Sequence, residues 1–272
     1  MNLLVLGDVF GQPGRETVKA HLPALRRDLR IDAAIVNAEN AAHGFGLTEK
    51  IAGELYEAGA DVLTTGNHVW DQRELIPYLD RDPRVLRPAN FPPGTPGLGM
   101  RLHRLGDGRA VLVINLMGRL FMDALDDPFR GLDAAIGGHR LGHDVAAIVV
   151  DFHGEATSEK TALGHFADGR VSAVIGTHTH IPTADARLLA GGTAYISDVG
   201  MCGDYDSVIG LEKQASIRRF LTKMPGPKKP EPAVGEATLC GAFVVTDDLT
   251  GLASRTEPVR LGGRLASHVP VL

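Results

Sequence analysis

Short apolar runs alternate with amphipathic segments in the first third of the chain. Three runs are expected to be buried parallel strands, at residues 2–8, 33–40 and 61–68. Helices are expected after them, at residues 14–29, 48–58 and near 71–80. In the first helix, Val18, Leu22 and Leu25 fall on one stripe. This alternation predicts a βαβαβ unit with a right-handed parallel arrangement.

The later part of the chain departs from this alternation. Residues 99–105 and 109–117 flank a Gly-Asp-Gly turn, which predicts an antiparallel hairpin. Further strands are expected at 146–154, 172–180, 193–200 and 238–247, with helices between the first two and at 209–223. The antiparallel segments predict a second sheet packed against the first. We therefore expect an α/β fold in one domain, residues 1–272, with an exposed Pro-rich loop at 225–236.

Composition narrows the classes of partner. The net charge of −5 argues against a broad nucleic-acid surface, although a small nucleotide ligand is compatible with it. Cys202 and Cys240 form neither a CxxC motif nor a disulfide framework, which fits a reducing compartment. The N-terminus lacks the pattern of a signal peptide, and no apolar run approaches the length of a membrane span. We expect a cytoplasmic protein with no membrane partner.

Metal- and proton-binding side chains follow five of the apolar runs. They are Asp8, Glu39 with Asn40, Asn67 with His68, His153, and His178 with His180. The carboxyl ends of strands in an open α/β sheet line the ligand crevice, so these segments are expected to converge. Oxygen and imidazole donors without thiolate suit manganese, iron or similar divalent ions better than a structural thiolate zinc site.

Taken singly, several of these residues have an ordinary structural explanation. Asp8 and Asn40 are common turn residues, and a lone histidine such as His153 is more often structural than a ligand. Glu39 favours function, because an unpaired buried carboxylate is costly where an apolar side chain would normally continue. His178 and His180 are expected on one face of an extended strand end, where they could serve two adjacent ions.

The ordered motifs GDVFG, NAEN, GNHVWD, DFHGE and GTHTH resemble those of the calcineurin-like metallophosphoesterases. The match covers the chain from residue 2 to about residue 200, and its details are similar to the bacterial YmdB-like subfamily. The resemblance implies a four-layer α/β/β/α sandwich of two mixed sheets flanked by helices. It also implies a cytoplasmic phosphodiesterase that acts on 2′,3′-cyclic nucleotides through two metal ions, iron or manganese.

The resemblance also assigns roles by position. One ion is assigned to Asp8, Glu39, His180 and Asn40, and the other to Glu39, Asn67, His153 and His178. Glu39 would bridge the ions, a shared hydroxide would attack phosphorus, and His68 would donate the proton to the leaving oxygen. Two positions depart from the superfamily pattern: Phe10 stands where a ligand histidine is usual, and Glu39 stands where aspartate is usual. Asn40 would replace the missing imidazole with a weaker amide oxygen.

Three functions stay open at this point. The first is the phosphodiesterase, and the second is a phosphomonoesterase or nucleotidase on the same centre. The third is a nucleotide-sensing regulator with vestigial hydrolysis, an alternative that Phe10 keeps open. In each case the partner is a small nucleotide or phosphodiester. The apolar-rich stretch 193–217 leaves a homo-oligomer open.

Overall fold

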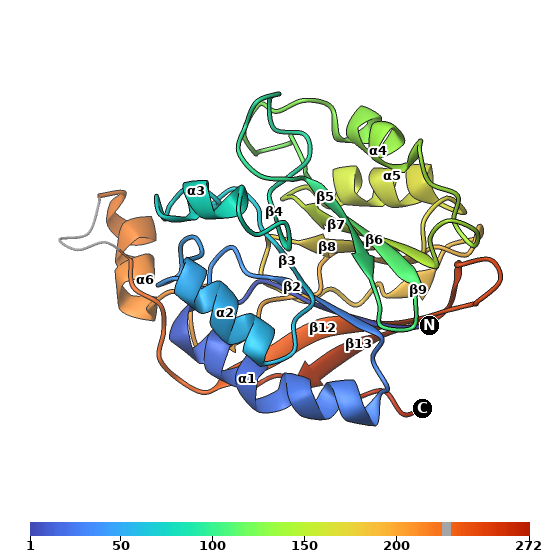
Figure 1. Ribbon diagram of the computed structural model, residues 1–272. Helices are drawn as coiled ribbons and strands as arrows, with labels where there is room; N and C mark the ends of the chain where they lie inside the picture. The colour runs from blue at the N-terminus through green and yellow to red at the C-terminus, as the bar shows by residue number, and fades with distance from the viewer. Residues whose placement is uncertain (225–229) are drawn as a thin grey trace.

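The computed structural model describes residues 1–224 and 230–272 (Figure 1). Its helices are α1 Gly11–Asp28, α2 Glu49–Glu57, α3 Leu75–Leu79, α4 Pro128–Ile136, α5 Thr157–Ala167 and α6 Lys213–Thr222. Its first strands are β1 Asn2–Leu6, β2 Ala33–Asn37, β3 Val62–Thr64, β4 Val85–Leu86, β5 Met100–Arg104, β6 Ala110–Met117 and β7 Ala147–His153. The remaining strands are β8 Ala173–Thr177, β9 Arg187–Leu188, β10 Ala194–Ile196, β11 Gly203–Asp204, β12 Ala237–Thr246 and β13 Ala253–Leu261. Part of the loop expected at 225–236, residues 225–229, lies outside the described residues.

The strands form two mixed sheets (Figure 1). The first has the order β11-β12-β1-β2-β3-β4, with β13 beside β12, and β1, β2 and β3 run parallel as predicted. The second has the order β5-β6-β7-β8-β10-β9, and it contains the predicted antiparallel pair β5–β6. The expected α/β class with two mixed sheets and flanking helices is therefore confirmed.

Successive side chains along a strand point alternately into the layer between the two sheets and toward the helices. In β1, Leu3 and Val5 pack into the apolar layer between the sheets, whereas Leu4 and Leu6 pack on the helix side. The helix side of the first sheet is covered by α1 and α2, and the outer face of the second sheet by α4 and α5. Each fully buried leucine contributes about 1.5–3 kcal/mol, so the strand period fixes which face of each sheet points inward.

Helix α4, strand β13 and the two-residue strands β4, β9 and β11 were not expected from the hydrophobic pattern. Helix α4 is short, and Asp127 caps it by accepting hydrogen bonds from the backbone N–H groups of Phe129 and Arg130. Its Asp-Pro start is a helix signal that a search for apolar runs does not register. Strand β13 pairs with β12 but is mostly half-buried, so its sequence is too polar to stand out.

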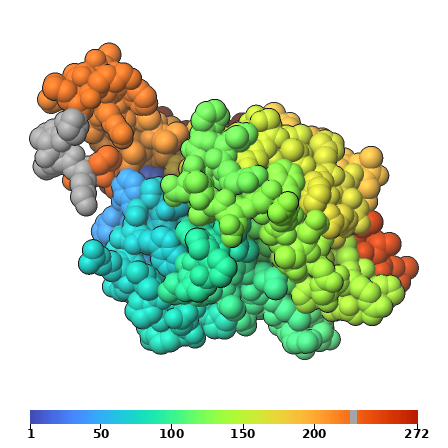
Figure 2. All heavy atoms as spheres, turned by 90° about the horizontal axis from the view of Figure 1, so that it is seen from above, coloured from blue at the N-terminus to red at the C-terminus, as the bar shows by residue number. Residues whose placement is uncertain are grey.

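Helix α6 covers less than the range expected for it, and none of its residues is buried. Figure 2 shows it in orange, standing out from one end of the molecule. Its Phe220 and Leu221 side chains are 69% and 80% exposed. The homo-oligomer stays a prediction. Within residues 1–224 and 230–272, no helix is both long and apolar enough to cross a membrane.

Replacement of Gly176 by alanine tests the tight packing of β8 against the backbone that follows β10. A Cβ atom at Gly176 would lie 1.7 Å from the carbonyl oxygen of Ser197, and a backbone atom cannot move aside cheaply. We expect Gly176→Ala to lower the free energy of unfolding in urea by at least ~2 kcal/mol. Gly53→Ala in α2, where a Cβ meets nothing within 4 Å, should instead raise it by about 0.5–1 kcal/mol. An unchanged unfolding midpoint for Gly176→Ala would contradict this packing.

Candidate metal centre

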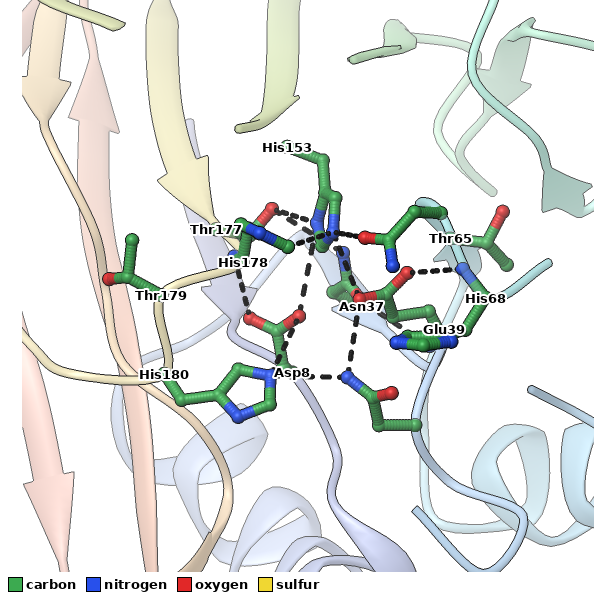
Figure 3. Close-up of polar contacts among 12 residues, drawn as sticks. Asp8, Asn37, Glu39, Thr65, His68, His153, Thr177, His178, Thr179 and His180 are labelled. Atoms are coloured by element: carbon green, nitrogen blue, oxygen red, sulfur yellow. Dashed lines mark hydrogen bonds and ion pairs between the residues drawn. The ribbon is translucent and has the colours of Figure 1, made fainter. Parts of the chain in front are cut away.

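The expected ligands lie where the carboxyl ends of strands from both sheets meet. Asp8 follows β1 and Glu39 follows β2 in the first sheet, whereas His153 ends β7 and His178 follows β8 in the second. Figure 3 shows these side chains pointing toward a common centre. Asp8, Glu39 and His153 are fully buried. The predicted convergence of strand ends therefore occurs across two sheets rather than along one.

Two groups of ligand atoms form at this centre. Glu39, His153 and His178 make one group, and Asp8, Glu39 and His180 make the other; within each, the atoms lie within 4.8 Å of one another. The two asparagines flank these groups: the Asn67 Oδ1 is 3.0 Å from the Nε2 of His153, and the Asn40 Nδ2 is 3.2 Å from the Nε2 of His180. All the side chains expected to bind metal are thus brought together, with Glu39 shared between the groups.

Unpartnered oxygen atoms show that divalent cations fit this centre. Asp8 Oδ1 and Asn40 Oδ1 are buried and have no hydrogen-bond partner among the described residues. A buried acceptor without a partner typically costs about 1–3 kcal/mol, and a cation would satisfy the Asp8 oxygen. The Asn40 Nδ2 faces Glu39 and His180, so a half-turn of that amide would bring its oxygen to the same cation. Around the Nε2 of His153, the Glu39 Oε1 lies at 2.9 Å and the His178 Nδ1 at 3.0 Å. Oxygen and nitrogen ligand atoms therefore gather as they do around a metal ion.

Burial and the charges of neighbouring ligands shift the pKa values of the candidate ligands. Burial raises the pKa of Asp8 to about 6. Burial would also raise the pKa of Glu39, but the charge of His153 and the hydrogen bond to it hold that pKa low. Burial, followed by repulsion from His153, lowers the pKa of His178 to about 3. A neutral His178 keeps a nitrogen lone pair free, as a metal ligand requires.

The local backbone at the two histidines corrects one expectation. Strand β8 ends at Thr177, so His178 and His180 do not share the face of an extended strand. Their φ angles are 97° and 67°, in the left-handed region that non-glycine residues rarely adopt. This turn sends the two rings to different ligand groups, at a cost of about 1–3 kcal/mol for each residue.

A buried ion pair holds this turn in place. The Lys160 Nζ lies 2.9 Å from the Asp198 Oδ2 and donates a hydrogen bond of 2.7 Å to the carbonyl oxygen of Thr177. The same Asp198 oxygen accepts a hydrogen bond from the backbone N–H of Thr179. Both charged side chains are 1% exposed. The pair therefore forms hydrogen bonds with the backbone on each side of His178. No apolar pattern in the sequence indicates this role.

Phe10 covers one ligand instead of supplying another. Its ring meets the ring of His180 edge to face, with centroids 5.3 Å apart. The Nδ1 of His180 donates to the carbonyl oxygen of Ile209 at 2.8 Å, so its Nε2 is free to face Asp8 and Asn40. Phe10 thus helps to orient His180 where the superfamily pattern has a further imidazole.

His68 stands beside the ligand groups without joining them. Its backbone N–H donates to the Glu39 Oε2, and its Nδ1 lies 2.8 Å from the Asp71 Oδ2. The ring of Phe45 meets the His68 ring edge to face at 5.1 Å. These contacts fix the ring, and within residues 1–224 and 230–272 its Nε2 has no hydrogen-bond partner. Asp71 and Phe45 were missed from the sequence, although Asp71 lies within the motif GNHVWD.

Comparisons with known proteins find relatives and solved structures that are similar over nearly the whole chain. A sequence model described as YmdB-like protein matches residues 4–259. A Bacillus subtilis (strain 168) protein named 2′,3′-cyclic-nucleotide 2′-phosphodiesterase is 48% identical over 259 residues, covering 95% of this chain and 96% of its own. A crystal structure of a hypothetical protein from Thermus thermophilus has 44% identity and a TM-score of 0.90, covering 97% of this chain and 100% of that chain. A crystal structure described as a novel phosphatase from Mycoplasma pneumoniae has 35% identity and a TM-score of 0.88, covering 96% of this chain and 93% of that chain.

Removal of the Lys160 charge tests the buried ion pair. Lys160→Met leaves Asp198 buried without its partner, so we expect the free energy of unfolding to fall by about 3–5 kcal/mol. Lys213→Met is the matched control, because Lys213 and Asp206 form a pair in which both side chains are roughly half exposed. Its effect in the same urea titration should be below about 1 kcal/mol. Equal effects of the two substitutions would show that the buried Lys160–Asp198 ion pair does not stabilise the fold as expected.

Proposed function

Because the chain belongs to the YmdB-like protein family, we propose that it is a metal-dependent phosphodiesterase that hydrolyses small phosphodiesters, chiefly 2′,3′-cyclic nucleotides. The observation that carries the proposal is the pair of ligand groups joined by Glu39, with His68 beside them. The name of the Bacillus subtilis relative supports the choice of substrate.

We assign the ligands as the sequence motifs suggest. One ion would be held by Asp8, Glu39, Asn40 and His180, and the other by Glu39, Asn67, His153 and His178. Their oxygen and imidazole donors suit iron or manganese. When bound, two such ions neutralise charge on the phosphoryl group and activate water as a nucleophile.

The side chains of the centre favour an anionic substrate and its cleavage. Asp8 and Glu39 carry at most two negative charges, so two divalent ions would leave net positive charge for the phosphate. His68 would donate a proton from Nε2 to the leaving ester oxygen. Asp71 accepts from Nδ1 of the same ring and so stabilises its protonated form. The hydrogen bond from the His68 backbone N–H to Glu39 keeps this proton donor next to the ligand groups.

A cavity next to His68 gives room for the nucleoside. Its volume is about 770 Å³, within the usual range for small-molecule sites, and its lining includes Phe45, Asp71, Gln72 and His43. Phe45 and Asp71 are also the residues that contact the His68 ring. Because the acid protonates the leaving oxygen, the sugar that carries this oxygen would lie on the His68 side, toward this cavity.

A direct comparison of substrates tests the function. With Mn²⁺ or Fe²⁺ added, the purified protein should hydrolyse 2′,3′-cyclic AMP faster than adenosine monophosphates. Glu39→Gln should bind fewer metal ions by elemental analysis and hydrolyse neither substrate, because it weakens both ligand groups at once. Preference for the monophosphate would favour the second candidate, a phosphomonoesterase, which the phosphatase name of the Mycoplasma pneumoniae structure also supports. Tight nucleotide binding with negligible turnover at saturating metal would favour the nucleotide-sensing regulator.

A change of leaving group tests the acid. His68→Ala should retain its metal ions but lose about 10²–10⁴-fold in kcat on 2′,3′-cyclic AMP, whose alkoxide leaving group needs a proton. On bis(p-nitrophenyl) phosphate the loss should be much smaller, because nitrophenolate leaves without one. Equal losses on the two substrates would show that His68 serves some purpose other than proton donation.

A further inference from the structure

Three motif residues and Thr64, all outside the proposed ligand set, meet in one buried cluster. They are Asn37 of NAEN, Thr64 at the end of β3, Asp151 of DFHGE, and Thr177 of GTHTH. All four are fully buried, and they come from β2 and β3 in one sheet and from β7 and β8 in the other. Figure 3 shows Asn37 and Thr177 next to the ring of His153.

The hydrogen bonds in this cluster have a fixed direction. The Asp151 Oδ2 accepts from the hydroxyl of Thr64 and from the Asn37 Nδ2, while its Oδ1 accepts from the hydroxyl of Thr177 at 2.7 Å. The Thr177 proton is thus committed to Asp151. Its oxygen can then only accept from His153, whose Nδ1 lies 2.9 Å away. The proton of the His153 ring is thereby held on Nδ1.

The opposite nitrogen of the same ring faces the ligand centre. The Nε2 of His153 lies 2.9 Å from the Glu39 Oε1 and 3.0 Å from the Asn67 Oδ1. We propose that Asp151, acting through Thr177, is a positioning residue that holds His153 in the tautomer and orientation that bind one of the two metal ions. This inference rests on the proposed metal-dependent function and identifies residues that set its metal affinity.

A purely structural role explains this cluster less well. A buried carboxylate is costly to desolvate, and apolar side chains join two sheets without that cost. Asp151 nevertheless has three donors, and one of these donors touches His153 directly. Carboxylates that orient a ligand histidine typically contribute about 10–100-fold to metal affinity.

Paired substitutions at Thr177 test the chain of contacts. Mn²⁺ binding to metal-stripped protein is measured by titration calorimetry, with wild type expected to bind two ions. Thr177→Val keeps the shape but removes the hydroxyl, so one of the two ions should bind ~10–100-fold more weakly. Thr177→Ser keeps the hydroxyl and should restore most of that affinity. Loss of both ions in Thr177→Val, without rescue by Thr177→Ser, would indicate general disruption and overturn the proposal.

Asp151→Asn provides a second and independent variant. The amide oxygen is expected to stay on the side with two donors, so the NH₂ group would face Thr177. The Thr177 hydroxyl would then donate to the His153 Nδ1 and favour the wrong tautomer. We expect the same single ion to be weakened. Thr64→Val removes another hydrogen bond to Asp151 but leaves the path to His153 intact, so its Mn²⁺ affinities should stay near wild type.

The outcomes separate this inference from the proposed function. A wild-type protein that binds no Mn²⁺ would refute the metal-dependent function itself. Wild type with two ions, and Thr177→Val and Asp151→Asn with unchanged affinities, would refute only the positioning role. Equal weakening in Thr64→Val and Thr177→Val would assign the cluster to stability and also overturn the inference.

Discussion

The carboxylate of Glu39 is the constraint on which the rest of this centre depends. It is fully buried where the two sheets meet, and a charge in that environment must be compensated by neighbours. His153 and the backbone N–H of His68 supply that compensation from different strand ends. The position of Glu39 also requires a glycine at position 66, directly before Asn67. A Cβ atom at Gly66 would lie 2.4 Å from the Glu39 Oε2 and 2.3 Å from the Cδ2 of His153.

The surrounding structure offsets the cost of the histidine turn. His178 and His180 have left-handed backbones, and such strain persists only where other contacts over-determine it. The Lys160–Asp198 pair does so at Thr177 and Thr179, on both sides of His178. Thr177 therefore has two functions: its carbonyl oxygen accepts a hydrogen bond from Lys160, and its hydroxyl contacts the ring of His153.

Much of the fold and the location of the site could be predicted from the sequence. Parallel strands must present their carboxyl ends at one edge, so Asp8, Glu39 and Asn67 had to lie close together once β1, β2 and β3 were recognised. The details depend on contacts between sheets. Lys160 and Asp151 acquire their roles from partners that are distant in sequence, and the turn at His178 depends on backbone angles that residue type does not dictate. Strand β13 and helix α4 were missed because neither has an apolar run long enough to register.

Phe10 makes the two proposed sites chemically unequal. The group around His180 contains one imidazole and the carboxylates of Asp8 and Glu39, whereas the other group contains two imidazoles and Glu39. Asn40 has a buried oxygen with no partner among the described residues, so a harder donor would replace the imidazole absent at position 10 and would keep the proposed ligand number. Harder ligands favour manganese or iron over softer ions at that position. The aromatic ring of Phe10 also packs against His180 and shields it from solvent. The departure from the superfamily pattern would therefore change the metal preference of one proposed site and leave a donor set suited to catalysis, which supports the proposed enzyme over a vestigial sensor.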